Sequence, residues 1–263
     1  MLSLPNEIMT IIAYLLEPRK RVKLREVCMA RSKLFSNSQS WSDIRTESVR
    51  EILLYASEFG RLESLKWLVR TFSLDQRDIR TNNNFAIHCS CVCGHLKTAR
   101  RLVKTFNLNQ GDIRSCNNYA FRGSCEYGHL EMVKWLTSAF DLNQKDARTS
   151  NNYAFRWACK NGHLKVAQWL VDKFDLTRED AKSIDNYALS WACSRDHFDV
   201  AQWLISRFSL TREDACMWDS YIVSTPEIKH NHTVRWLNDT FSIYCAKKIL
   251  YFFSHAKIND DYR

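Results

Sequence analysis

Three cysteines and a histidine lie close together and have the composition of a zinc site: Cys89, Cys91, Cys93 and His95. Structural zinc sites need ligands that converge tetrahedrally on one ion. On an α-helix, however, residues two apart point about 200° away from each other, so Cys91 would face away from Cys89 and Cys93. We therefore expect no metal site in this cluster and no cofactor.

A histidine and an aspartate recur along the chain, as a series of catalytic residues would. Each occurs once in every 34 residues, and the members are His95, His129, His163 and His197, with Asp78, Asp112, Asp146, Asp180 and Asp214. Regular recurrence predicts structural roles, the histidines supporting turns and the aspartates capping helices. No glycine-rich phosphate loop, nucleophile elbow or His-Glu-x-x-His motif occurs. We expect that the protein is not an enzyme.

Glycines with the same spacing indicate the elements that position these side chains: Gly60, Gly94, Gly128 and Gly162. A fixed period of this length predicts stacked helical units, each too small to fold alone. In the clearest copy, residues 153–160 form a first helix, Gly162 ends it, and residues 164–174 form a second helix with apolar residues at helical spacing. We expect Asn152 to cap the first helix through its side-chain oxygen.

The connector after each second helix has a pattern of its own. Thr177 followed three residues later by Asp180 resembles a capping box, which predicts a short helical turn. Periodic leucines should anchor the connectors to the core, namely Leu74, Leu108, Leu142, Leu176 and Leu210. Six helix pairs can be counted, starting near residues 50, 84, 118, 152, 186 and 220. The predicted fold is therefore all-α, with a helical-repeat solenoid over residues 45–241 and a closing helix and tail over residues 242–263.

Composition and charge narrow the cellular setting. Four of the ten cysteines, Cys91, Cys125, Cys159 and Cys193, follow the repeat period, so we expect buried apolar side chains and no disulfides. This predicts a reducing compartment, the cytoplasm or the nucleus. No segment approaches the roughly 20 apolar residues of a membrane span, and the N-terminus lacks a secretory signal. The net charge of +9 is spread thinly, so nucleic acid is not an expected partner.

The repeat resembles the ankyrin repeat in its order of helix, Asn-Gly-His-Leu turn, helix and long connector. The segment Leu-Lys-Val-Ala-Gln-Trp-Leu-Val at residues 164–171 matches that family well, whereas Asn-Tyr-Ala-Phe replaces the family's Thr-Pro-Leu-His opening. We therefore describe the array as ankyrin-like. The Phe-x-Leu-Thr-x-x-Asp-Ala connector is similar to those of repeat proteins encoded by large DNA viruses. The resemblance implies a protein-binding array whose concave face comes from first helices and connectors.

A comparison of the copies with one another indicates where a partner would bind. Framework positions stay similar between copies, whereas several first-helix positions vary, and aromatic and arginine side chains are favoured interface anchors. We predict a target-binding surface made of Arg122, Tyr127, Arg156, Trp157, Trp191 and Arg195. The alternative is that Trp157 and Trp191 belong to the core.

Residues 1–44 do not follow the period. They contain Leu-Pro-x-Glu-Ile from Leu4, Leu-Arg-x-Val-Cys from Leu24, and Trp41, and the spacing predicts three short helices, about 5–16, 18–29 and 30–36. This arrangement resembles an F-box module, although Arg31 stands where that family often has Trp. The resemblance implies docking onto a Skp-type adaptor of a cullin–RING ubiquitin ligase. The contact residues it implies are Leu4, Pro5, Ile8, Ile11, Leu15, Leu24 and Val27. The alternative is a helical cap on the first repeat.

Taken together, these features favour a substrate-recognition adaptor. The F-box-like segment would recruit the ligase, and the repeats would hold a target protein for ubiquitin transfer by other subunits. The main alternative is an ankyrin-like scaffold that sequesters a partner without recruiting a ligase. A nucleic-acid binder is the third possibility, and an enzyme is the last.

Overall fold

The computed structural model describes residues 47–216 and 231–241, and every regular element in these two ranges is helical. The predicted all-α class is therefore confirmed for the described part of the chain. The predicted F-box-like module, residues 1–44, and the predicted C-terminal cap, residues 242–263, both lie outside it. The chain divides into two compact units, Met1–Phe121 and Arg122–Arg263, which we call unit 1 and unit 2.

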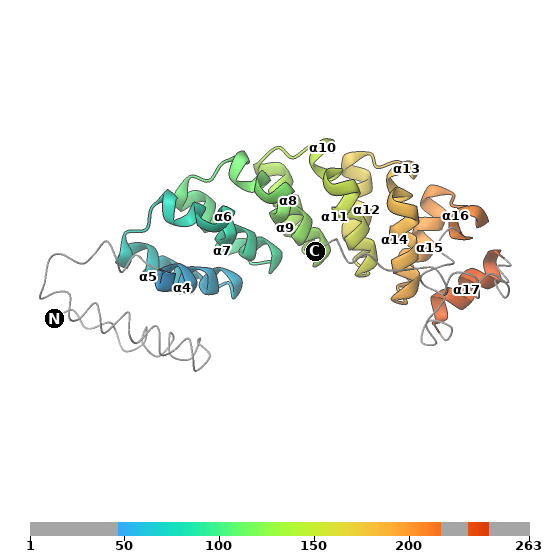
Figure 1. Ribbon diagram of the computed structural model, residues 1–263, viewed down its shortest axis with the longest axis horizontal. Helices are drawn as coiled ribbons and strands as arrows, with labels where there is room; N and C mark the ends of the chain where they lie inside the picture. Colours follow the sequence, from blue (N-terminus) through green and yellow to red (C-terminus); the bar gives the residue numbers. More distant parts are fainter. Residues whose placement is uncertain (1–46, 217–230, 242–263) are drawn as a thin grey trace, which may run out of the picture. The chain divides into compact units, whose positions relative to one another are not determined.

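Unit 1 contains two helix pairs and the start of a third (Figure 1). Helix α4 (Glu47–Glu58) pairs with α5 (Leu62–Phe72), and α6 (Gln76–Val92) pairs with α7 (Leu96–Phe106). Between the pairs, α4 packs on α6 and α5 packs on α7. Helix α8 (Gln110–Glu126) begins in unit 1 and ends in unit 2. First helices thus pack on first helices and second helices on second helices, as in a stacked repeat array.

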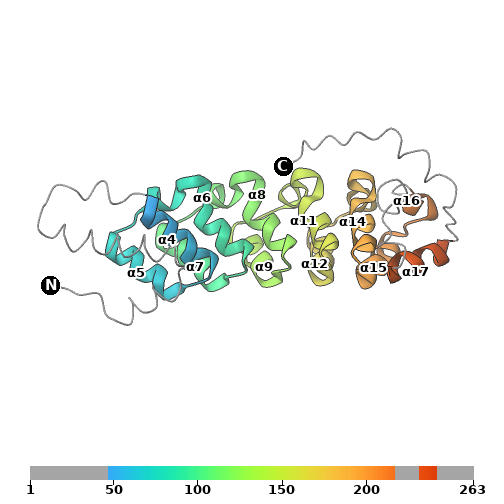
Figure 2. The same cartoon turned by 60° about the horizontal axis from the view of Figure 1, so that its bottom comes forward.

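Unit 2 continues the pattern. Its long helices are α9 (Leu130–Ala139), α11 (Thr149–Lys160), α12 (Leu164–Phe174), α14 (Ser183–Ser194), α15 (Phe198–Phe208) and α17 (His232–Phe241). Its short connector helices are α10 (Gln144–Ala147), α13 (Arg178–Ala181) and α16 (Arg212–Cys216). In Figure 2, α11 and α14 form one row, and α9, α12 and α15 form another. Helix α17 occupies the place of the second helix in the sixth predicted pair, whose first helix falls outside the described residues.

Each pair encloses a small apolar core. Helix α12 buries Val166, Ala167, Leu170, Val171 and Phe174. The predicted anchoring of the connectors is also confirmed, because Leu74, Leu108, Leu142, Leu176 and Leu210 are all at most 9% exposed. The periodic cysteines are buried free thiols, as predicted, and no disulfide occurs among the described residues. Burial of roughly three large side chains per helix provides the main stabilisation of such units.

The glycine–histidine turns join neighbouring repeats. The His95 ring lies against Gly60 of the preceding repeat, and its Nε2–H donates to the carbonyl of Glu58 over 2.8 Å. A Cβ at Gly60 would lie 2.4 Å from His95 Nδ1, so no other residue fits this turn without displacing the ring. Within unit 2, His163 covers Gly128 in the same way. The predicted turn-supporting role of the histidines is confirmed, but each supports the turn before its own.

A left-handed stretch precedes the first helices and overturns one sequence prediction. Ser150, Asn151 and Asn152 have φ values of 55°, 55° and 58°, a conformation that asparagine tolerates better than most residues. Asn152 does not cap α11, because its side-chain oxygen is buried and accepts no hydrogen bond from the described residues. Its amide instead donates to Asp180 of the next connector over 3.2 Å. The prediction was wrong because it assumed extended backbone at Asn152, which a capping residue needs.

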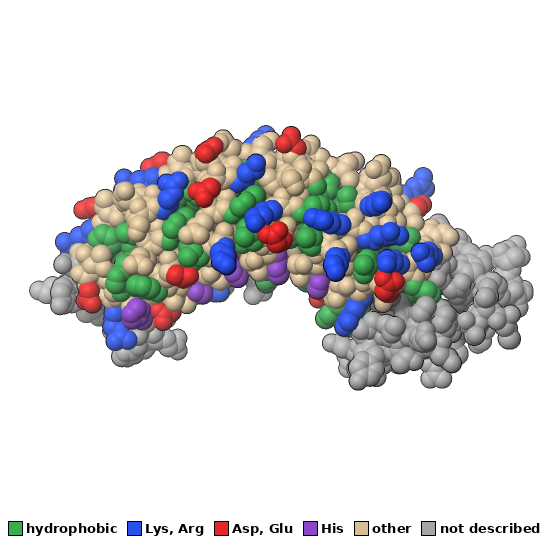
Figure 3. Space-filling view, turned by 180° about the vertical axis from the view of Figure 1, so that it is seen from behind, with side chains coloured by type: hydrophobic (Ala, Val, Ile, Leu, Met, Phe, Trp, Pro, Cys, Tyr) green, Lys and Arg blue, Asp and Glu red, His purple; other side chains and the backbone are tan. Residues whose placement is uncertain are grey.

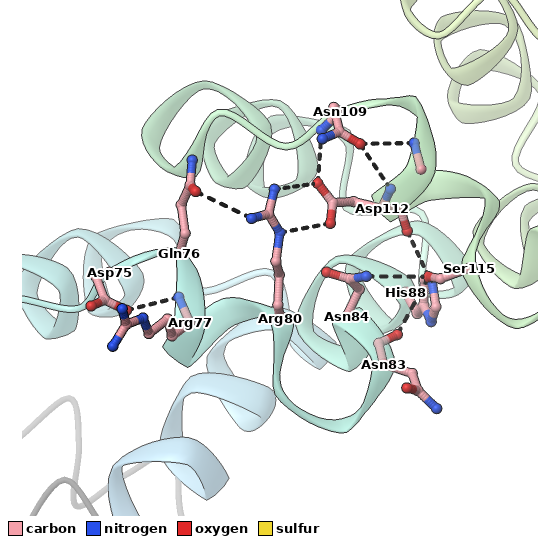
Figure 4. A network of polar contacts seen from close by, with 11 residues as sticks. Asp75, Gln76, Arg77, Arg80, Asn83, Asn84, His88, Asn109, Asp112 and Ser115 are labelled. Atoms are coloured by element: carbon pink, nitrogen blue, oxygen red, sulfur yellow. Dashed lines mark hydrogen bonds and ion pairs between the residues drawn. The ribbon is translucent and has the colours of Figure 1, made fainter.

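Polar networks tie each connector to the next (Figure 4). In unit 1, the Arg80 guanidinium donates to both carboxylate oxygens of Asp112, over 2.8 and 2.9 Å. Asp112 also accepts from the backbone N–H of Asn109, which closes the start of α8. Partial burial of Asp112 raises its pKa, but the hydrogen bonds from Arg80 and Asn109 outweigh that effect and hold the pKa below its usual value. The connectors therefore act as caps and as inter-repeat bridges at once.

Unit 2 repeats these bridges beside the first helices that carry the candidate site. Arg148 donates to both carboxylate oxygens of Asp180 over 3.0 and 2.8 Å. Asp180 is also the third residue of a capping box with Thr177, as the sequence predicts. One repeat later, Lys182 and Arg178 both pair with Asp214. Paired donors of this kind are charge-assisted and directional, so they set the spacing between α11 and α14.

Candidate functional site

A ladder of four aromatic side chains runs across the first helices of unit 2. Tyr153 and Trp157 stand four residues apart on α11, and Tyr187 and Trp191 stand in the equivalent places on α14. Residues four apart share one face of a helix, and α11 packs directly against α14. The repeat spacing therefore brings two pairs of rings together into one surface, which we call the aromatic ladder.

The rings of the aromatic ladder contact one another in sequence. Tyr153 stacks on Trp157 with centroids 5.1 Å apart and planes inclined by 18°. Trp157 lies 6.4 Å from Tyr187, and Tyr187 lies 5.7 Å from Trp191. All four side chains are partly exposed. Trp157 and Trp191 are thus neither core residues nor free surface residues, and their outer edges remain open to a partner.

Lys160 lies inside the ladder and connects its two helices. Its Nζ is 3.7 Å from the Trp157 ring centre and 4.2 Å from that of Trp191, and it donates to the Tyr187 hydroxyl over 3.0 Å. The side chain is only 7% exposed. Burial lowers the pKa of Lys160, and the positive charge of Arg195 lowers it further. A desolvated ammonium over aromatic faces is an unusually strong cation–π contact, so Lys160 holds the two tryptophans apart at a defined distance.

Arg156 has a different role from the one predicted. It is 6% exposed, and its Nε donates to the carbonyl of Asn151 over 2.6 Å while Nη2 donates to that of Ser150 over 3.1 Å. These are backbone groups of the left-handed stretch at the start of α11. Burial lowers the pKa of Arg156, and its guanidinium also lies 4.7 Å from the Tyr187 ring centre. Arg156 therefore stabilises the site from within, and the burial leaves its guanidinium no room to contact a partner.

Two of the other predicted residues, Arg122 and Arg195, lie along the margin of the ladder. Arg122 sits 4.5 Å from the Tyr153 ring centre. Arg195 is exposed, lies 5.7 Å from the Trp191 ring centre, and donates to the side-chain oxygen of Asn161 over 3.0 Å. Tyr127 is 55% exposed. Of the six predicted residues, the structure thus places Arg122, Trp157, Trp191 and Arg195 on one surface of unit 2, buries Arg156 beneath it, and leaves Tyr127 exposed at the end of α8.

The charge on this surface is positive. Arg122, Arg156, Lys160 and Arg195 contribute four cations, and a carboxylate is hydrogen-bonded into the ladder, because Glu126 accepts from the Tyr153 hydroxyl over 2.9 Å. A half-exposed aromatic surface with excess positive charge fits a partner that offers apolar side chains and carboxylates.

Sequence analysis missed four members of this site: Glu126, Tyr153, Lys160 and Tyr187. The two tyrosines follow the 34-residue period, as do Phe85 and Tyr119, and a periodic residue is readily assigned to the framework. The useful signal was the four-residue spacing between each tyrosine and a tryptophan, which occurs only in the copies beginning near residues 152 and 186.

No group of three or more His, Cys, Asp or Glu side chains within the described ranges has the geometry to hold a metal ion. Burial raises the pKa of Cys89 to about 12, so its thiol stays protonated at neutral pH. No described helix is long and apolar enough to cross a membrane. The seven predicted adaptor-docking residues, Leu4 to Val27, lie outside the described residues.

Comparisons with known proteins identify the family to which the repeats are similar. A family model described as ankyrin repeats in three copies matches residues 52–146 and again residues 119–214. No curated protein sequence matches the chain. The crystal structure of an ankyrin repeat family protein from Legionella pneumophila is similar, with a TM-score of 0.46 and 19% sequence identity, over 91% of this chain and 83% of that one.

Proposed function

Because the chain belongs to the ankyrin-repeat family, which consists generally of non-enzymatic interaction scaffolds, we propose that it is a protein-interaction adaptor that captures a target on the aromatic ladder. The observation that carries this proposal is the ladder itself. Two tyrosines and two tryptophans with open edges lie over caged cations on adjacent helices. Tryptophan, tyrosine and arginine dominate the energetics of protein interfaces.

The ladder is also rigid before a partner arrives. Lys160 is hydrogen-bonded to Tyr187 and packed between the two tryptophans, and Arg156 is hydrogen-bonded to the backbone carbonyls of Asn151 and Ser150. Side chains that are already ordered lose little entropy on binding. We expect the target to place an apolar side chain against the outer edges of Trp157 and Trp191 and a carboxylate near Arg195.

A test should use margin residues, because substitutions inside the cage would also affect folding. Arg122→Ala with Arg195→Ala removes two cations at the margin, and the matched control, Lys165→Ala with Lys173→Ala, removes two exposed cations from α12. Targets are identified by crosslinking the wild-type chain in cells, and the affinity of each purified target is then measured. We expect the margin variant to weaken binding by about tenfold or more and the control to bind normally. Equal binding by all three proteins would remove the ladder as the target site.

We further propose that residues 1–44 recruit a Skp-type adaptor and a cullin, which would make the protein a substrate-recognition subunit of a ubiquitin ligase. The support is the resemblance of the Leu-Pro-x-Glu-Ile and Leu-Arg-x-Val-Cys segments to an F-box. Leu4→Ala with Pro5→Ala should abolish copurification of adaptor and cullin while target binding persists. If the wild-type chain binds its target but neither ligase component, the alternative of a scaffold that sequesters its partner is correct.

The proposed setting is the cytoplasm, with the nucleus as the alternative. Support comes from the buried, periodic free thiols, which suit a reducing compartment. The connectors are similar to those of repeat proteins encoded by large DNA viruses, and for a viral protein this compartment would be the cytoplasm of the host cell. Imaging a tagged chain in infected or transfected cells tests the location directly.

A further inference from the structure

A continuous stripe of basic side chains covers the exposed side of α7 in unit 1. Its members are Lys97, Arg100, Arg101 and Lys104, all of them exposed. Their spacing of three, one and three residues places them on one helical face over roughly 10 Å. No acidic residue occurs anywhere in α7. In Figure 3, Lys and Arg side chains crowd the surface of unit 1, in the right half of the view. We call this set the α7 stripe.

The other second helices do not carry such a stripe. The positions equivalent to Lys97 include Glu63 on α5 and Glu131 on α9, each of which pairs with a lysine three residues later, over 2.6 and 2.9 Å. On α12 and α15, the equivalent sets include Asp172 and Asp199. Every other described second helix of a complete pair thus supplies a carboxylate to this face, and α7 alone supplies four cations.

Two features of the stripe, the replaced tryptophan and the spacing of like charges, do not favour the stability of α7. Arg101 stands where α5, α9, α12 and α15 carry tryptophan. In α5 that residue, Trp67, makes an edge contact with Phe72 at 5.8 Å, and such aromatic pairs are stabilising. Like charges three and four residues apart on a helix are destabilising. The arginine at position 101 lacks the aromatic contact of the other repeats, and the stripe adds charge repulsion within α7. Such a pattern indicates selection for binding instead of for stability.

We propose that the α7 stripe binds an acidic segment of a partner protein, at a place separate from the aromatic ladder. Carboxylates on a short helix or extended strand would match the roughly 5–6 Å steps between the stripe's cations. A nucleic-acid backbone would require a positive track that continues across neighbouring helices. In unit 1 the positive track is interrupted at α5, where Glu63 is 80% exposed at the position equivalent to Lys97, although Lys66 and Arg70 stand at the positions equivalent to Arg100 and Lys104. A full set of four cations on one helix therefore favours a short acidic polypeptide.

The test is the binding of a fluorescein-labelled poly-glutamate peptide to the full chain, followed by fluorescence anisotropy at about 0.05 M salt. The stripe variant carries Arg100→Gln, Arg101→Gln and Lys104→Gln. The matched control carries Lys134→Gln, Lys165→Gln and Lys173→Gln, which removes the same charge from α9 and α12. We expect the stripe variant to bind about tenfold more weakly and the control within about twofold of wild type, with a shallower salt dependence for the stripe variant.

Arg101→Trp separates binding from structure. It restores the residue found in the other repeats, so we expect a higher melting temperature together with weaker peptide binding. Equal weakening by the stripe variant and the control would show that only net charge matters, which overturns the proposal. Failure of the wild-type chain to bind the peptide also overturns it. So would tighter, stripe-dependent binding of a single-stranded oligonucleotide or of phosphatidylserine vesicles, since that would assign the stripe to another class of partner.

Discussion

Replacing Gly162 with alanine tests how neighbouring repeats are joined. Gly162 has φ of +75°, and an added Cβ would lie 2.5 Å from His197 Nδ1 and 2.7 Å from Cε1. Alanine in the left-handed region costs about 1–2 kcal/mol. Displacing the His197 ring also breaks its hydrogen bond to the backbone of Lys160, for about another 1 kcal/mol. With the strain of overpacking, about 1–3 kcal/mol, the free energy of unfolding should fall by about 3–6 kcal/mol.

A double-mutant cycle identifies the residue that causes this loss. Removing the ring with His197→Ala relieves the overlap, so Gly162→Ala in that background should cost only its backbone strain, about 1–2 kcal/mol. The matched control is His163→Ala, which removes the histidine next to Gly162 in sequence but lies against Gly128 instead. It should leave the full cost of Gly162→Ala in place. Urea unfolding followed by circular dichroism gives the four free energies of each cycle.

The two cycles can refute the reasoning clearly. We expect a favourable coupling of about 2–4 kcal/mol between Gly162 and His197 and a coupling near zero between Gly162 and His163. If both couplings were within about 0.5 kcal/mol of zero, the histidine would not cover the preceding glycine. If the coupling to His163 were the larger, the turn would be supported by its own histidine, as sequence alone suggests.

Three further outcomes follow from buried groups and ion pairs. Burial lowers the pKa of His88 to about 4. Below pH 6.5 the unfolded chain therefore binds a proton that the folded chain excludes, and the free energy of unfolding should fall by about 2–4 kcal/mol between pH 6.5 and 4. His88→Gln should flatten this part of a plot of urea midpoint against pH. Arg148→Gln should lower the free energy of unfolding by about 1–2 kcal/mol through loss of its bidentate pair with Asp180, a result that an unchanged calorimetric transition would contradict. Cys116 is exposed, whereas Cys159 is buried with a raised pKa. A thiol-labelling reagent should therefore modify Cys116 within minutes and Cys159 only in denaturant, as mapped by mass spectrometry. Similar labelling rates at the two cysteines would show that the core opens readily.

The amino-acid sequence by itself determined the elements of the repeat and their order. Helix ends, capping boxes and anchoring leucines depend on residues close together in the chain. Thr177 and Asp180, for example, form the expected capping box, and Leu176 is buried as expected. Repetition marks these features as structural, because a feature that recurs once per repeat does not arise from chance composition.

Only the tertiary structure decided which side chains meet between repeats. His163 covers Gly128, Asn152 donates to Asp180, and Lys160 reaches Tyr187. These partners lie some 27 to 35 residues apart, and which of them meet depends on the offset between stacked helices. Arg156 shows the consequence: its sequence position suggested a binding residue, but the left-handed backbone beside it offers two carbonyl acceptors and draws the guanidinium inside. Buried polar groups must find partners, and in this array the packing of neighbouring repeats determines where those partners are.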